Sequence, residues 1–277
     1  LKGLKPATRY YVKIIEYNGC GSSIVYESGS DTLSFLTSAR YYYTKSTGAL
    51  NELATWGDRP DGSGNAPLSL SIDSVTYCVV NNMFPYIASD SVVFGSPSCK
   101  VILGDSLSLI ELTIPDTTNF IVKKLQVTPY AKLRIMGSLT GSGTLTGDSL
   151  SEIICVNSKN VLTTLNAHNL QLVSTGGQLV INSSVTVRNK LLLNADARLN
   201  SISIGTDSIH PGELVYGSGS IATPGGVKRY IRSAITTSGQ GFFPVAYYNS
   251  GTGLYYKRFL TINFTTAPTR GGLVTAN

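Results

Sequence analysis

Between residues 71 and 226 the chain alternates short runs of apolar and polar side chains. Two or three apolar residues occur at every second position, and a Gly, Asn, Asp or Ser then interrupts the run. A period of two is typical of a β-strand with one buried face. The alternating pairs are Leu107/Leu109, Leu112/Ile114, Leu125/Val127, Leu133/Ile135, Leu170/Leu172, Leu179/Ile181, Val185/Val187, Leu191/Leu193 and Ile202/Ile204.

These runs recur at roughly 20 residues, which lies within the period expected of a solenoid. Successive runs start near Leu112, Leu133, Ile153, Leu170, Leu191 and Leu214. We therefore predict an all-β fold built on a right-handed parallel β-helix over 71–226, in which inward side chains stack from coil to coil. Glycines within 137–147 would allow tight corners. A β-sandwich is the competing fold, although it favours longer and more regularly spaced strands.

The first 38 residues contain a proline turn followed by an alternating strand. Pro6 precedes Tyr10, Val12 and Ile14, which fall on one strand face. The stretch from Leu4 to Tyr10 resembles the corner before the penultimate strand of a fibronectin type III domain. The resemblance implies that Tyr10 forms a tyrosine corner, that 30–37 is the closing strand, and that 1–38 is the C-terminal part of such a domain. The resemblance does not say whether the earlier strands lie upstream or come from another chain.

Residues 39–70 are rich in turn-forming residues and contain Trp56, the one tryptophan of the chain. We interpret this segment as a linker and an N-terminal cap. In a turn-rich segment, an isolated Trp is most simply an apolar plug over the open end of a core. The alternative is that Trp56 stacks on a sugar ring.

After residue 226 the strands become longer and more aromatic, so 227–277 is predicted to be an antiparallel β cap or the start of a sandwich. Consecutive residues of a strand point to opposite faces, so one member of Tyr247/Tyr248 and one of Tyr255/Tyr256 should face outward. Exposed tyrosines bind sugars or protein partners. The alternative is that both faces are buried.

The order of these features resembles large secreted or cell-surface proteins of Bacteroidetes. Shared features are the fibronectin-like end, the Gly-Ser-Leu-Thr-Gly-Ser-Gly-Thr-Leu stretch of 137–145, and Val-Lys-Arg-Tyr-Ile at 227–231. Such proteins are exported by the type IX secretion system and combine fibronectin type III modules with β-helical stretches. The resemblance implies an extracellular or cell-surface location.

Composition and charge narrow the function further. The 277 residues carry 22 basic and 16 acidic side chains, a net charge of +6 that is scattered along the chain. Nucleic-acid binders concentrate basic residues in a patch, so we expect no nucleic-acid binding. No apolar run approaches the roughly 20 residues of a membrane-spanning helix, and we expect no membrane insertion.

Cys78 and Cys99 would form a disulfide if they lay on neighbouring turns, or they are buried thiols.

Candidate chemistry is sparse. The acidic residues of the repeats occur singly in turn contexts, and His168 and His210 also read as turn residues without a nucleophile or ligand partner. Asp58, Asp61, Ser63 and Asn65 place oxygen atoms around Gly62, so calcium is one interpretation and a hydrogen-bonded turn is the other. We predict no catalytic residues and no cofactor apart from this calcium alternative.

The sequence therefore predicts a non-enzymatic structural or adhesive segment that acts as a rigid stalk or display scaffold. Its expected partners are a glycan or a cell-surface protein. The first alternative is a carbohydrate-active module that binds or cleaves polysaccharide. The second is a component of a self-associating fibre.

Overall fold

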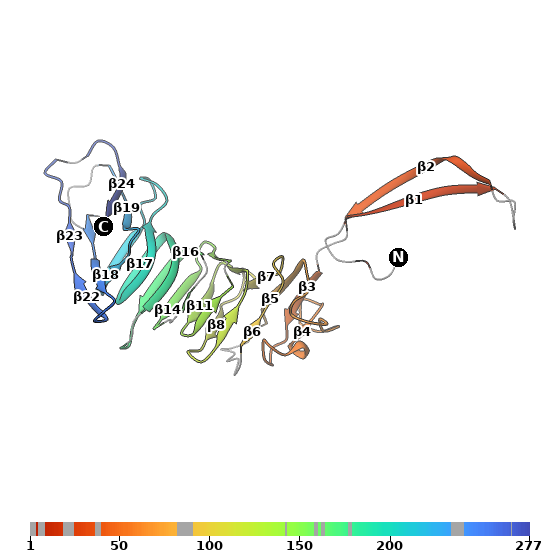
Figure 1. Cartoon of the computed structure of the whole chain (residues 1–277), viewed down its shortest axis with the longest axis horizontal. Helices are drawn as coiled ribbons and strands as arrows, with labels where there is room; N and C mark the ends of the chain where they lie inside the picture. Colours follow the sequence, from red (N-terminus) through yellow and green to blue (C-terminus); the bar gives the residue numbers. More distant parts are fainter. Residues whose placement is uncertain are drawn as a thin grey trace.

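The computed structural model is an all-β chain built around a β-solenoid of about seven turns (Figure 1). It describes residues 4, 9–18, 25–36, 40–81, 91–141, 143–157, 160–161, 164–176, 179–233, 241–266 and 268–277. Among these residues, no helix is long and apolar enough to cross a membrane. The predicted β-solenoid is confirmed.

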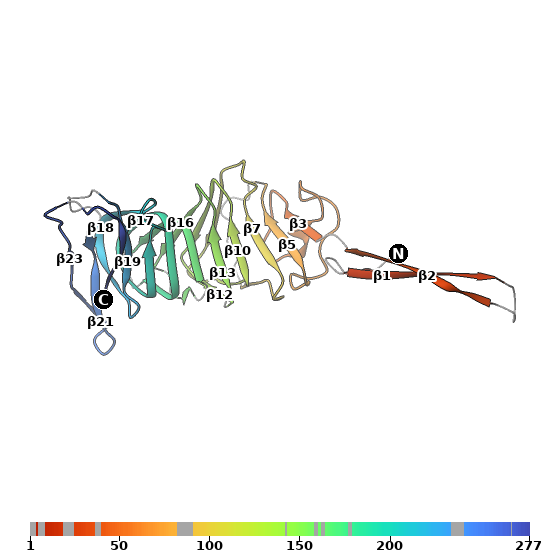
Figure 2. The same cartoon turned by 90° about the horizontal axis from the view of Figure 1, so that it is seen from above.

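The first face of the solenoid is a stack of parallel strands, which lie side by side in Figure 2. Its strands are β3 (Arg40–Thr44), β5 (Val75–Val79), β7 (Lys100–Leu103), β10 (Lys124–Val127), β13 (Thr144–Gly147), the start of β16 (Thr164–Val173), two segments of β17 (Leu179–Ile204) at 185–187 and 202–204, and β19 (Val227–Ile231). The parallel stack thus includes strands on both sides of the 71–226 range. Residues in register along it are Tyr42, Tyr77, Val101, Leu125, Leu145, Leu165 and Val185.

The second face contains the repeat that the sequence revealed. Its strands are β8 (Ile110–Ile114), β11 (Ala131–Ile135), β14 (Glu152–Val156), the second half of β16, part of β17 and the start of β18 (Glu213–Ala222). The six predicted starting points lie in register on successive coils, from Leu112 through Leu133, Ile153, Leu170 and Leu191 to Leu214.

The third face is shorter and closes the cross-section. It consists of β6 (Val92–Val93), β9 (Asn119–Ile121), β12 (Ser138–Thr140), β15 (Asn160–Val161) and part of β17. Val92, Phe120, Leu139, Val161 and Ile181 form its inner column. All five are at most 2% exposed. The three inner columns therefore enclose one continuous apolar core that no single coil could bury.

One predicted pair does not belong to this core. Leu107 and Leu109 are 86% and 77% exposed, because they lie in the loop before β8 rather than on a strand. The carboxylate of Asp105 accepts hydrogen bonds from the backbone N–H groups of Leu107 and Ser108 and thereby forms that loop. Alternation alone did not distinguish this loop from a strand.

The corners within 137–147 depend on glycine, as the sequence predicts. Gly141 has a φ of +122°, and a Cβ atom there would lie 2.3 Å from the carbonyl oxygen of Val122 on the preceding coil. Non-glycine residues rarely adopt such a φ. Gly141 therefore permits the close approach of two coils.

The two ends differ from the coils. At the N-terminal end, η1 (Leu53–Thr55) leads into β4 (Trp56–Gly57), which pairs antiparallel with β3. At the C-terminal end the strands are β20 (Phe242–Phe243), β21 (Val245–Asn249), β22 (Leu254–Lys257), β23 (Leu260–Thr261) and β24 (Gly272–Ala276). There, the antiparallel pairs are β19–β24, β20–β23 and β21–β22.

A separate hairpin, β1 (Arg9–Asn18) and β2 (Val25–Leu36), extends from the N-terminal end of the solenoid (Figures 1 and 2). Tyr10 stacks on Phe35, with 6.0 Å between the ring centroids. On the same face Ile14 and Leu33 are 57% and 60% exposed. Pro6 lies outside the described residues. The hairpin matches the two predicted strands, while membership of a fibronectin-type domain stays a prediction.

Cys78 and Cys99 are buried thiols and do not form a disulfide. Burial raises the pKa of Cys78 to about 11 and that of Cys99 to about 12. The disulfide alternative for this pair is therefore wrong. Cys20 lies outside the described residues.

Candidate functional site

The β21–β22 hairpin at the C-terminal end presents the tyrosines that the sequence singled out. Tyr247 lies opposite Tyr256, and Tyr248 lies opposite Tyr255. Tyr247 and Tyr256 are 60% and 45% exposed, and their ring centroids are 6.2 Å apart. This outward pair, which we call the tyrosine pair, offers two neighbouring aromatic surfaces to solvent.

The other two tyrosines face the solenoid. Their ring centroids are 5.0 Å apart, and the guanidinium carbon of Arg198 lies 5.0 Å from the ring centroid of Tyr248. The Tyr255 hydroxyl is buried without a hydrogen-bond partner among the described residues. Burial raises the pKa of Tyr255 to about 12. Consecutive tyrosines thus point to opposite faces, as strand alternation predicts, and Tyr248 and Tyr255 serve to pack the hairpin onto the last coils.

Two shallow grooves near the hairpin supply polar groups. One, of about 290 Å³, has Arg198, Thr223, Tyr247 and Tyr248 among its lining residues. The other, of about 470 Å³, contains Asp196 and Lys257, whose charged atoms are 3.8 Å apart. Aromatic faces next to hydrogen-bonding groups are the combination that binds a sugar ring, which has apolar C–H faces and hydroxyl edges.

Trp56 has no part in such a surface. Its side chain is completely buried, and its indole Nε1–H donates a hydrogen bond to the carbonyl oxygen of Leu50 at 3.1 Å. The ring packs edge-on against Tyr77 and Phe94. Because no face of the indole is exposed, the sugar-stacking alternative for Trp56 is wrong, and the side chain is an apolar plug at the N-terminal end of the core.

The oxygen-rich segment around Gly62 forms two hydrogen-bonded turns. Asp58 accepts hydrogen bonds from the backbone N–H and the side-chain amide of Asn65, at 3.1 and 3.2 Å. Asp61 accepts hydrogen bonds from the backbone N–H and the hydroxyl of Ser63, at 2.9 and 2.7 Å. These donors lower the pKa of both carboxyls. The amide of Asn65 presents a donor to Asp58, so the arrangement corresponds to the turn interpretation rather than to a set of converging calcium ligands.

Carboxylates along the coils pair one at a time with groups on neighbouring coils. Glu152 lies 3.1 Å from Lys132, Glu111 lies 3.7 Å from Arg134, and Asp148 accepts a hydrogen bond from Gln126. Within the described ranges, no three His, Cys, Asp or Glu side chains gather closely enough to hold a metal ion. Each acid of these pairs therefore has a basic or amide partner on a neighbouring coil.

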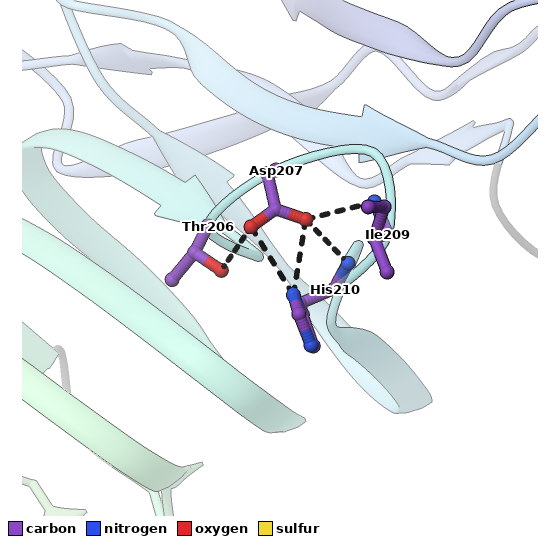
Figure 3. A network of polar contacts seen from close by, with 4 residues as sticks. All are labelled: Thr206, Asp207, Ile209 and His210. Atoms are coloured by element: carbon purple, nitrogen blue, oxygen red, sulfur yellow. Dashed lines mark hydrogen bonds and ion pairs between the residues drawn. The ribbon is translucent and has the colours of Figure 1, made fainter.

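His210 lies in the turn between β17 and β18, as the sequence predicts (Figure 3). Asp207 organises this turn by accepting hydrogen bonds from the backbone N–H groups of Ile209 and His210, and one of its oxygens lies 3.1 Å from His210 Nδ1. His168 does not lie in a turn. It lies inside β16, where the pairing with β17 shifts by one residue.

The sequence analysis did not identify one further cluster. Arg188, Arg229 and Arg232 are separated by up to 44 positions, yet they line one groove of about 830 Å³ beside the Asp207 turn. The recurrence of roughly 20 residues between coils is the signal that aligns distant residues in this way. To predict which polar residues meet, one must also know how the chain turns at each corner, and the sequence does not give that geometry.

Comparison of the chain with protein-family models, with curated proteins and with solved structures finds no match.

Proposed function

We propose that this chain is a non-enzymatic structural and adhesive segment of a large extracellular bacterial surface protein, in which the solenoid is a rigid stalk or display scaffold. The observation that carries the proposal is the unbroken stacking of parallel strands on the first face, from β3 to β19. Each coil is hydrogen-bonded to the next, and its inward apolar side chains pack against those of the neighbouring coils. Bending such a stack requires many bonds and contacts to be broken together, so it resists bending.

The ends of the chain support the same proposal. β24 pairs antiparallel with β19 and thereby covers the edge of the last parallel strand, which is what a cap does for a solenoid. The exposed apolar face of the β1–β2 hairpin is the face that the rest of a fibronectin-type sandwich would cover. A Bacteroidetes source and type IX secretion belong to this proposal on the strength of the sequence resemblance.

Two measurements test the stalk and its location. We expect small-angle X-ray scattering to give the profile of an elongated monomer that does not change with concentration. We expect protease treatment of intact cells to remove the segment from its parent protein. A compact profile contradicts the stalk, growth of the particle with concentration favours the fibre alternative, and full protection on intact cells contradicts a surface location.

The tyrosine pair favours a second function, which is carbohydrate binding. Exposed aromatic side chains are enriched where proteins bind partners, and contiguous exposed apolar surface marks such sites. Cleavage is less favoured than binding, because glycosidases place two carboxylates across the scissile bond, whereas Glu111, Asp148 and Glu152 each pair with a basic or amide group.

A glycan array with matched variants tests this second function. We expect Tyr247→Ala and Tyr256→Ala each to weaken binding roughly tenfold, and Tyr256→Phe to retain it, because stacking needs the ring and not the hydroxyl. Tyr130→Ala is the control, since Tyr130 is 49% exposed on a different part of the solenoid. Binding that survives both alanine variants, or that Tyr130→Ala weakens equally, contradicts a site at the tyrosine pair.

A further inference from the structure

The arginine groove lies at the corner between the first and second faces, where the turn of residues 205–212 projects from the coil. Arg188 follows the β17 segment of the first face, Arg229 belongs to β19, and Arg232 follows β19. His168 comes from β16, and Asp207 fixes the outer wall through the hydrogen bonds in Figure 3. Basic side chains from β16, β17 and β19 thus line one hollow of about 830 Å³.

The arginines are held at different depths. Arg229 is 1% exposed and stacks on Ile204, and its Nη1 donates a hydrogen bond to the carbonyl oxygen of Phe242 at 2.7 Å. Arg188 donates from Nη2 to the carbonyl oxygen of Gly147. Its Nε is buried and has no hydrogen-bond partner among the described residues. A positive side chain that is buried at the base of a groove gains most from an anion placed within the groove.

The basic side chains that line this groove outnumber the acidic ones. Glu213 is the one carboxylate among the described residues that line the groove, and its carboxylate lies 3.6 Å from Lys190. Asp207 is engaged with His210. Burial and the charge of Arg188 lower the pKa of His168, so its ring is mostly neutral at pH 7. The three arginines therefore set the charge of the groove.

The remaining lining residues are of two kinds. Ser149, Thr206 and Asn189 supply hydroxyl and amide groups, while Ile209 and Pro211 supply apolar surface. No Phe, Tyr or Trp occurs among the described lining residues, so the groove lacks the aromatic platform on which a nucleic-acid base stacks. Guanidinium groups, hydrogen-bonding groups and a small apolar wall match a sugar that bears an anionic group.

We propose that the arginine groove binds an acidic polysaccharide through a carboxylate or sulfate group on one of its sugars. Arg188 and Arg232 pair with the anionic group, and the buried Arg229 adds positive charge at the base of the groove. The neutral lining side chains contact the ring hydroxyls and the C–H face of the sugar. This site is separate from the tyrosine pair, and the stalk proposal does not depend on it.

Binding of the whole chain to matched polysaccharides tests the proposal. We would compare dextran sulfate with dextran, and polygalacturonate with its methyl ester, by titration calorimetry at 150 mM salt. We expect an acidic polymer of at least one pair to bind and its neutral counterpart not to bind. Inorganic sulfate and single-stranded DNA are added as competitors.

Three variants locate the site. Arg188→Gln and Arg232→Gln each remove one positive charge, and Asn189→Asp adds a negative charge at an exposed lining residue with little change in size. We expect each to weaken binding of the acidic polymer on the order of tenfold. Arg134→Gln removes the same charge from a different coil and is expected to have little effect. Thermal melts check that the variants are folded. If Arg188→Gln does not fold, Asn189→Asp still tests the site, because it retains every arginine.

The proposal is overturned if no acidic polymer binds, or if DNA binds more tightly than the polysaccharides at the same salt concentration. It is also overturned if Arg134→Gln weakens binding as much as the groove variants do, or if Asn189→Asp and Arg232→Gln leave binding unchanged. Equal loss on Arg134→Gln would show attraction to the net charge of +6 rather than a site. Failure of these experiments leaves the scattering test of the stalk unaffected.

Discussion

The indole ring of Trp56 lies edge-on against the phenol ring of Tyr77, with 5.2 Å between the ring centroids, and both side chains are completely buried. Tyr77 is part of the first face of the solenoid, whereas Trp56 comes from the turn-rich segment before it. This contact joins the irregular N-terminal segment to the repetitive core.

Replacement of the indole should therefore destabilise the N-terminal end of the solenoid. We expect Trp56→Ala to cost about 3–5 kcal/mol in free energy of unfolding, because it leaves a large cavity beside Tyr77 and Phe94. Urea denaturation followed by circular dichroism measures this loss. Leu68→Ala is the control, since Leu68 is 90% exposed. A Trp56 variant as stable as the control would contradict the plug.

Alanine substitution should also distinguish a leucine of the inner column from a leucine of the loop that has the same sequence pattern. Leu133 is completely buried between Leu112 and Ile153, while Leu107 is 86% exposed. We expect Leu133→Ala to lower the free energy of unfolding by about 2–5 kcal/mol and Leu107→Ala to change it by less than about 0.5 kcal/mol. Similar values for the two variants, measured by the same urea unfolding, would mean that the assignment of the inner column is wrong.

Replacement of tyrosine by phenylalanine should have opposite effects on stability at Tyr77 and Tyr255. The Tyr77 hydroxyl donates a hydrogen bond to the carbonyl oxygen of Ser69 at 2.8 Å, whereas the buried Tyr255 hydroxyl lacks a partner among the described residues. We expect Tyr77→Phe to destabilise the chain by about 1 kcal/mol and Tyr255→Phe to be neutral or stabilising. Thermal melting of both variants checks this, and a large loss on Tyr255→Phe would count against it.

The buried thiols should be unreactive while the solenoid is folded. With pKa values of about 11 and 12, Cys78 and Cys99 have at most roughly one thiolate in a thousand at pH 8. We expect a maleimide reagent to label both thiols in urea but not in the native protein, with mass spectrometry of peptides as the readout. Rapid native labelling of either cysteine would show that the first coils open readily.

Acid should weaken the turns that aspartates organise. Backbone N–H donors lower the pKa of Asp105 and Asp207 below the ordinary value of 3.8. Because the folded state favours the ionised form, these carboxylates stabilise the fold above that value, and the stabilisation is lost as the pH falls through the lower folded pKa. We expect the urea midpoint to decrease between about pH 4 and pH 2. Asp105→Asn should make this decrease shallower, and an unchanged pH dependence would refute its contribution.

The candidate sites differ in how much of them the sequence could predict. Alternation along a strand was enough to place Tyr247 and Tyr248 on opposite faces, and Tyr255 and Tyr256 likewise. That Tyr247 and Tyr256 share a face follows from the register of the hairpin. It could not decide which face was outward, because that depends on packing of the hairpin against Arg198. The arginine groove was beyond prediction, since Arg188 and Arg232 come together only through the coil geometry and the projecting turn.

The sequence by itself determined the β-solenoid. The apolar positions at Leu112, Leu133 and Ile153 recur at coil length, and this recurrence favours stacked coils over the competing sandwich. Only the tertiary structure decided which alternating run was a loop, how deeply Trp56 is buried, and which polar residues meet at a corner. These outcomes depend on contacts between residues far apart in the chain, and no local pattern encodes such contacts.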